Sequence, residues 1–400
     1  MTRDTVEHTN PFKIDVNLKD DQDSKRKHFF EKGLGALLAD EHFLLLYVPD
    51  NGAKMQVIRP ATNLYHQKRI LKRINEAEHI PSFYYALSHV WGITEENRYH
   101  WNDISEYVDD EQGQPVKPVS MRPEKRDALL GLLKDHPDSY WWIDVLCARV
   151  DTPLDIMGDI YACCLECIAM IDCDPSLISK LHTKTYVISN SVYDDPTPED
   201  LLDLKQIHED YPQLIDHLST LMQCKWWQRV WTWQEMALPF GNVCFMSERD
   251  TQRLSCNTIT VDDLLNSYSV LKRLQSWIFE IMQAREFNKQ RIEKMKAIDF
   301  LRLIGSLGFS SRQCMDPVDY VYGILGMLQI KMPRLDNPAD VWTRFLYELG
   351  NYMETMGPFE LEDGNIIKIN EHAYQIDICR ARDMADIYFL VLTITRKNER

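Results

Sequence analysis

The sequence predicts an α/β protein with a mainly parallel sheet flanked by helices. Short, almost continuously apolar segments such as 140–147 (YWWIDVLC) alternate with segments of helical periodicity. Strands that are apolar throughout are typical of parallel sheets buried on both faces. The composition, 44% hydrophobic and 26% charged residues, is that of a globular protein. We expect an N-terminal extension before this core and a helical region after it.

Residues 1–28 are polar and lack periodicity, which predicts a flexible tail. The next segment, 29–80, is predicted to form an extension with a hairpin between two helices. Its hairpin signal is Asn51-Gly52, a dipeptide typical of tight turns, flanked by two apolar runs. We expect the Asn51-Gly52 turn to be exposed. The predicted helix, two strands and helix cover residues 29–40, 43–48, 55–58 and 64–78.

Residues 81–248 contain the segments assigned to the parallel sheet. Helical segments separate the expected strands, and parallel pairing requires such crossovers. The strands are expected at residues 84–90, 140–147, 167–171 and 242–246. The helices are expected at residues 122–133, 154–166, 199–223 and 226–238.

Residues 249–400 have a helical pattern and are expected to pack against the α/β core. Thr260 with Asp263 resembles a capping box, and Asp316-Pro317 and Asn337-Pro338 are typical helix starts. We find no internal repeat and no low-complexity segment.

Charge and hydropathy exclude several classes of partner. The chain has 45 Lys and Arg against 61 Asp and Glu, a net charge of −16, which disfavours nucleic acid and anionic membranes. No apolar run approaches the roughly 18 residues of a membrane span, and the N-terminus has no signal-peptide pattern. We therefore expect a soluble, cytoplasmic protein.

The ten cysteines do not form a disulfide pattern. Cys164 and Cys167 have C-x-x-C spacing, but no second pair follows at zinc-finger spacing. Buried packing is the favoured interpretation, structural zinc is the alternative, and no metal site is predicted.

Polar residues at the ends of two expected strands are candidates for a ligand site. Ser88, Trp91 and Gly92 close the first strand, and Asp144 lies near the end of the second. In parallel α/β sheets, ligands bind at the carboxyl ends of the strands. Asp144 lies within an apolar run and therefore requires a partner.

Eight of the ten tryptophans lie between Trp91 and Trp233. If residues 226–238 form one helix, Trp227, Trp231 and Glu235 share a face. A carboxylate beside indoles has a raised pKa and suits a planar cationic group. The alternative is a core helix in which Glu235 pairs with an arginine.

Classical nucleotide-binding and hydrolase motifs are absent: the chain contains no G-x-G-x-x-G, Walker loop, G-x-S-x-G or H-E-x-x-H. A nucleophilic Cys147 assisted by His89 remains an alternative, although an apolar environment disfavours a thiolate.

Three ordered blocks resemble the fungal heterokaryon-incompatibility (HET) domain family. They are 85–92 (YALSHVWG), 142–147 (WIDVLC) and 229–235 (RVWTWQE). The family reads roughly Ala-Leu-Ser-Tyr-x-Trp-Gly, Trp-Ile-Asp-x-x-Cys-Ile-Asn-Gln and Arg-x-Trp-Thr-x-Gln-Glu. The resemblance covers about residues 81–245, with a weaker similarity at 316–322. His89 replaces the usual Tyr, and 148–150 (ARV) replaces Ile-Asn-Gln.

The resemblance implies a role in fungal self/non-self recognition, innate immunity and regulated cell death. HET domains are regarded as distant relatives of the TIR fold, some members of which hydrolyse NAD with a glutamate in a Trp-x-x-x-Glu helix. Trp231 and Glu235 have that spacing. The resemblance therefore implies a TIR-like sheet and an NAD glycohydrolase activity, with NAD as substrate and no other cofactor.

Cleavage of the nicotinamide–ribose bond passes through an oxocarbenium-like state, which a nearby carboxylate stabilises. Glu235 is the predicted catalytic residue, and the predicted substrate-binding residues are Ser88, Trp91, Gly92, Asp144 and Trp231. The expected partners are NAD and a second copy of the chain or another incompatibility or receptor protein. The alternative is a non-catalytic signalling or oligomerisation module.

Overall fold

The fold was analysed in a computed structural model. The structure describes residues 14–16, 24–77, 79–92, 99–182, 213, 216–251, 257–268, 297–356, 359–360, 366–367 and 378–397. The helical segment predicted at 199–223 lies largely outside the described residues.

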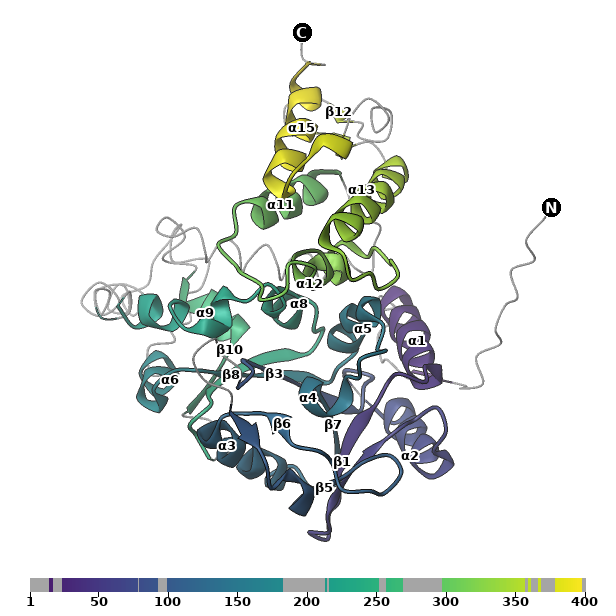
Figure 1. The fold of residues 1–400 in the computed structure, drawn as a ribbon, viewed down its shortest axis with the longest axis vertical. Helices are drawn as coiled ribbons and strands as arrows, with labels where there is room; N and C mark the ends of the chain where they lie inside the picture. The colour runs from purple at the N-terminus through teal and green to yellow at the C-terminus, as the bar shows by residue number, and fades with distance from the viewer. Residues whose placement is uncertain are drawn as a thin grey trace, which may run out of the picture.

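The central element is an eight-stranded sheet with strand order β10-β9-β8-β3-β7-β1-β2-β5 (Figure 1). Four consecutive strands are parallel: β9 pairs with β8, β8 with β3 and β3 with β7. The prediction that these four segments form one parallel sheet is confirmed. Their bounds are Tyr84–His89 (β3), Ser139–Ile143 (β7), Glu166–Ile171 (β8) and Asn242–Ser247 (β9).

The predicted hairpin is confirmed and extends the same sheet. Strands β1 (Leu45–Val48) and β2 (Met55–Ile58) pair antiparallel, and β1 also pairs antiparallel with β7. The Asn51-Gly52 turn is exposed, and Gly52 has a φ of 69°, which glycine adopts without steric cost. The sheet edges are β5 (Val108–Asp109) beside β2 and β10 (Thr258–Thr260) beside β9.

Helices cover both faces of the sheet. On one face lies α3 (Pro123–Lys134), and on the other lie α5 (Met157–Ala162) and α8 (Thr232–Ala237) (Figure 1). On the α5 face, the Tyr84 hydroxyl donates to the carbonyl of Ile160 at 2.5 Å. Further helices are α2 (Leu64–Asn75) and α6 (Pro175–His182), and a small sheet pairs β4 (His100–Trp101) with β6 (Val119–Ser120). A 3-10 turn, η2, covers Ile104–Glu106.

The N-terminal helix starts earlier than predicted. Helix α1 covers Ser24–Ala39, so the expected tail boundary at residue 28 lies inside it. Val16 is fully buried, and its backbone N–H donates to the Glu31 carboxylate at 3.2 Å. The segment before the helix therefore packs on it because Val16 supplies an apolar anchor.

Three predicted elements end or break earlier than expected. The strand predicted at 140–147 ends at Ile143, and α4 (Asp144–Cys147) follows as one helical turn. The helix predicted at 154–166 is a 3-10 turn, η3 (Leu154–Ile156), followed by α5. The helix predicted at 226–238 is η5 (Lys225–Gln228), a break and then α8.

The described part of the C-terminal region is mainly helical and packs against α5 and α8, as predicted (Figure 1). Its helices are α9 (Val261–Tyr268), α11 (Ala297–Gly308), α12 (Asp319–Leu328), α13 (Pro338–Glu354) and α15 (Met384–Lys397). A short pair, β11 (Phe359–Glu360) with β12 (Ile366–Ile367), and η9 (Ile378–Arg380) complete it.

Two of the three predicted helix starts in this region are confirmed. The Thr260 and Asp263 side chains bond each other's backbone N–H groups, which is the predicted capping box. The Asn337 side chain accepts from the N–H groups of Ala339 and Asp340. Helix α12 starts at Asp319, three residues after Asp316, whose carboxylate instead caps a turn through the Val318 N–H.

Candidate functional site

The site begins at the carboxyl end of β3, where two adjacent side chains point to opposite faces of the sheet. Successive side chains of a strand alternate between faces. Ser88 contacts α8 through Glu235, whereas His89 contacts α3 through Lys125. One strand end therefore supplies two separate polar clusters.

The first cluster is buried between the sheet and α8. The Ser88 hydroxyl donates to the Glu235 carboxylate and accepts from the indole N–H of Trp226 at 2.7 Å. Glu235 is 5% exposed and also accepts a hydrogen bond from Tyr161. We name Ser88, Glu235, Trp226 and Tyr161 the buried cluster.

The Glu235 carboxyl is the most perturbed acid of the site. Burial raises its pKa to about 7, and the negative charge of Asp144 adds to this effect. The Arg229 guanidinium and the Ser88 hydrogen bond act in the opposite direction. Glu235 therefore exchanges a proton near neutral pH, which is typical of functional carboxylates.

The predicted helix face shared by Trp227, Trp231 and Glu235 is wrong. Arg229 has extended backbone (φ −89°, ψ 136°), so Trp227 and Trp231 do not lie on one helix. Trp227 packs on Phe245, with ring centroids 5.2 Å apart. Trp231 caps α8 and bonds the carboxyl of Asp319, the first residue of α12.

The second cluster lies at the rim of the sheet. Asp144 accepts from the His89 Nε2 at 2.9 Å, the Trp91 indole N–H at 2.6 Å and the Val145 backbone N–H at 2.7 Å. The Asp144 side chain is 16% exposed and Trp91 is 42% exposed. We name Asp144, His89 and Trp91 the rim cluster.

The rim carboxylate is ionised. Burial alone would raise the pKa of Asp144, but His89, the Trp91 hydrogen bond and Arg229 together hold it below its usual value. Burial lowers the pKa of His89, against the opposing effect of Asp144. The two carboxylates of the site, Asp144 and Glu235, thus have opposite pKa shifts.

Sequence reasoning missed two basic residues of the site. Lys125 of α3 is fully buried, and its Nζ lies 3.2 Å from Glu248 and 3.5 Å from the His89 Nδ1. Arg229 donates to the backbone carbonyl of His89 at 2.6 Å. A lysine in a helical pattern is usually exposed, so no signal identified Lys125, whereas Arg229 already lay in the third sequence block.

The three sequence blocks therefore meet at one strand end: Ser88 and His89 from the first, Asp144 from the second, and Arg229 and Glu235 from the third. Residues 84–235 match the family model of the heterokaryon incompatibility protein (HET). No curated protein and no solved structure gives a significant match. We refer to residues 84–235 as the HET segment.

Two further candidate residues of the HET segment, Gly92 and Cys147, are tightly packed in the structure. A Cβ atom on Gly92 would lie 2.8 Å from the Met121 backbone, so this position requires glycine for close packing. Cys147 is buried, burial raises its pKa to about 12, and its Sγ lies 3.7 Å from the carbonyl of Trp141. His89 bonds Asp144 and does not assist a thiol, which argues against a nucleophilic Cys147.

The C-terminal region fixes the end of the HET segment. The Gln234 side chain donates to the carbonyl of Tyr322 at 3.0 Å and accepts from the N–H of Gly326 at 3.1 Å. A Cβ atom on Gly158 would lie 2.6 Å from the Gly326 Cα. The absence of side chains at both glycines therefore lets α5 and α12 approach closely, with Gln234 between them.

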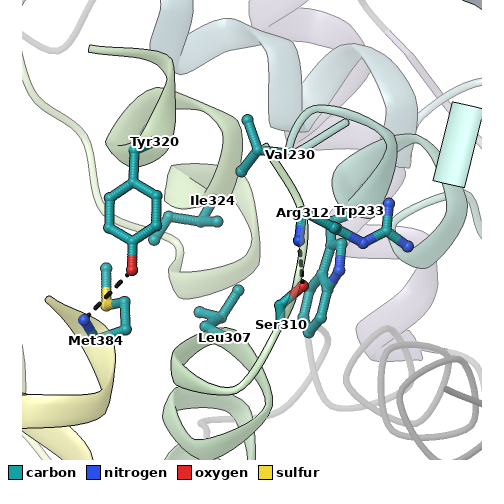
Figure 2. Close-up of a pocket in the computed structure, with 8 residues that line it drawn as sticks. All are labelled: Val230, Trp233, Leu307, Ser310, Arg312, Tyr320, Ile324 and Met384. Atoms are coloured by element: carbon teal, nitrogen blue, oxygen red, sulfur yellow. Dashed lines mark hydrogen bonds between the residues drawn. The ribbon is translucent and has the colours of Figure 1, made fainter. Parts of the chain in front are cut away.

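Two cavities lie near the HET segment without containing its buried cluster. One cavity, of about 20 Å³, lies between α8 on one side and α11, α12 and α15 on the other (Figure 2). Val230 and Trp233 are among the residues that line it, and it is too small for a dinucleotide. The other, of about 490 Å³, lies between the segments 151–156 and 331–334.

Within the described ranges, no three metal-ligating side chains gather at one point. The cysteines at 163, 164, 167 and 173 are buried in the core. None of the helices in these ranges is both long and apolar enough to cross a bilayer.

Proposed function

We propose that this chain is an effector of heterokaryon incompatibility that hydrolyses NAD at the nicotinamide–ribose bond. The observation that carries the proposal is Glu235: a buried carboxyl with a pKa of about 7, bonded to Ser88 at the carboxyl end of a parallel strand. Strand ends of this kind are the usual ligand sites of α/β proteins. The HET match supports the biological role.

The chemistry requires a negative charge beside the ribose. The bond between ribose C1′ and the nicotinamide nitrogen breaks, its electron pair leaves with nicotinamide, and positive charge develops on the ribose. Water then attacks C1′ and loses a proton, which gives ADP-ribose. Glu235 stabilises the ribose cation through the ribose hydroxyls, and Ser88 orients its carboxylate.

The rim cluster receives the nicotinamide end of the substrate. Its ionised Asp144 and half-exposed Trp91 suit a flat cationic ring. Trp231 supports α8 from the other side through Asp319 rather than stacking on the substrate. NAD is the substrate, and the scheme uses no metal and no other cofactor.

Burial of Glu235 fits an effector that is silent at rest. Glu235 and Ser88 are 5% and 1% exposed, so α8 or the end of β3 must move before a dinucleotide reaches them. Self-association or an incompatibility or receptor partner in the cytoplasm would supply this trigger. An ungated NAD hydrolase would deplete its own cell.

The second candidate is a non-catalytic, TIR-like signalling module. It is favoured by the same burial, because Ser88 and Tyr161 already satisfy the Glu235 carboxyl within the protein, and Trp226 holds Ser88 in place. In that case, the buried cluster stabilises α8 and the surface of the chain carries the function.

Nicotinamide release from NAD by the purified chain tests both candidates, with and without crowding or fusion to an oligomerising domain. We expect release by the wild type once it is oligomerised and none by Glu235→Gln, which removes the charge but keeps the shape. Glu124→Gln, at an exposed position of α3, is the matched control. Wild type without release in any state favours the module, and full release by Glu235→Gln refutes the site.

A further inference from the structure

The rim carboxylate of Asp144 is connected to a buried basic residue through one imidazole. The His89 Nε2 lies 2.9 Å from the Asp144 Oδ1, and the His89 Nδ1 lies 3.5 Å from the Lys125 Nζ. His89 and Lys125 are both buried completely. The His89 Nδ1 also lies 3.3 Å from the backbone carbonyl of Val90, which itself accepts from Lys125. Both nitrogens of His89 therefore face protein groups.

These neighbours determine the tautomer of His89. An ionised carboxylate only accepts hydrogen bonds, so the Nε2 nitrogen carries the proton toward Asp144. An ammonium group only donates, so the Nδ1 nitrogen accepts from Lys125. Burial lowers the pKa of His89, which keeps the imidazole neutral. A neutral His89 without a free nitrogen is unsuited to general-base catalysis.

Lys125 is itself held by three acceptors. Its Nζ contacts the Glu248 carboxylate, the Val90 carbonyl and the His89 Nδ1. Glu248 is 2% exposed and also pairs with Arg122 at 2.6 Å. An ammonium with three donors and three acceptors has a fixed position in this environment.

We propose that Lys125 and His89 are positioning residues that keep Asp144 as an oriented carboxylate anion beside Trp91. Lys125 fixes the imidazole, the imidazole donates to one Asp144 oxygen, and the other oxygen holds the Trp91 indole N–H. The charged groups around His89 are Asp144, Lys125 and Arg229, with Glu248 and Arg122 behind Lys125.

The inference rests on the proposed function for its consequence in catalysis. Two carboxylates with opposite pKa shifts serve different roles in one site. Asp144, ionised at neutral pH, faces the cationic nicotinamide ring, whereas Glu235 exchanges its proton near neutral pH. Lys125 and His89 thus act on substrate binding, and Glu235 acts on bond cleavage.

Nitrogen-15 NMR of full-length protein labelled at histidine and tryptophan tests the positioning directly and without NAD. In the wild type at pH 7, we expect neutral His89 with its proton on Nε2. In Lys125→Met, we expect the pKa of His89 to rise and the Trp91 indole N–H to lose its hydrogen-bonded chemical shift. Arg122→Met is the matched control, because it removes a cation from Glu248 without touching His89; it should leave both signals unchanged.

The NAD assay separates this inference from the proposed function. If the chain cleaves NAD, Lys125→Met should raise KM about tenfold with a smaller change in kcat, and Arg122→Met should leave KM within about twofold. A wild-type His89 that is charged or protonated on Nδ1 at pH 7 overturns the positioning, even if Lys125→Met fails to fold. Equal effects of Lys125→Met and Arg122→Met on the NMR signals also overturn it.

Discussion

The hydroxyl of Ser88 donates a hydrogen bond to the carboxylate of Glu235, 147 positions later in the chain. This bond joins the first and third sequence blocks of the HET segment across the face of the sheet. Ser88 also accepts from Trp226, so one small side chain orients both a carboxylate and an indole. The bond explains why a serine at the end of β3 and a glutamate on α8 occur in one site.

Glu235 predicts a pH dependence of folding stability. Its folded pKa of about 7 exceeds the ordinary 4.5, so the neutral carboxyl stabilises the fold at low pH. This contribution, at most about 3 kcal/mol, is lost as pH rises from about 4.5 through about 7. Glu235→Gln stays neutral, and its melting temperature should therefore rise relative to the wild type over this range.

Thermal unfolding of both proteins at pH 5, 6, 7 and 8 measures this difference. Glu124→Gln should follow the wild type at every pH, since Glu124 is exposed. A constant offset between wild type and Glu235→Gln would contradict the raised pKa.

Gly326 predicts that the C-terminal region stabilises the HET segment. A Cβ atom at this position would collide with the Gln234 side chain and lie 2.7 Å from the Gly158 Cα. Gly326→Ala should therefore separate α12 from α5 and α8, at a cost of about 1–3 kcal/mol.

Urea unfolding checks this cost, with Gly350→Ala as the control. Gly350 lies in α13, and an added Cβ would make only an ordinary contact, 3.6 Å from Ile378. Alanine favours helix over glycine by about 1 kcal/mol, so Gly350→Ala should be neutral or stabilising. Equal destabilisation by the two variants would show that close helix packing is not the cause.

Cys147 should resist alkylation in the native protein. Its thiol is buried and its pKa is raised to about 12, so the reactive thiolate is scarce at neutral pH. Cys379, which is exposed, should react before Cys147. Iodoacetamide labelling followed by peptide mass spectrometry measures the order, and rapid labelling of Cys147 would restore the nucleophile hypothesis.

Val16 predicts that the segment before α1 contributes to stability. Its side chain is fully buried, and burial of a valine contributes about 1.5–3 kcal/mol. Val16→Asp should lower the melting temperature by several degrees, whereas deletion of residues 1–13 should leave it nearly unchanged. An unaltered melting temperature in Val16→Asp would support the undocked tail expected from the sequence.

The parallel sheet and the hairpin were predictable because their signals are local. Apolar runs between helical segments identify β3, β7, β8 and β9, and an Asn-Gly turn identifies the β1–β2 hairpin. The pairing of β1 with β7 was not predictable, because a hairpin can join either edge of the four parallel strands, and each edge offers a row of free hydrogen-bonding groups.

The break before α8 was missed because periodicity ignores tertiary contacts. The segment WWQRVWTWQEM fits helical spacing, but the main chain of Val230 donates to the carbonyl of Gln313 at 3.0 Å. This bond and the Arg229 contact to the His89 carbonyl keep residue 229 extended. Long-range contacts thus override local helix propensity.

The candidate site residues could be read from the sequence alone: Ser88, Asp144 and Glu235 lie in blocks that are visible without coordinates. Their division between the buried cluster and the rim cluster follows only from the three-dimensional fold. Because adjacent side chains of a strand point to opposite faces, Ser88 joins Glu235 in a buried cluster, while His89 joins Asp144 at the rim. The resulting difference in burial and charge neighbours sets the opposite pKa shifts of the two carboxylates, and no local pattern contains that information.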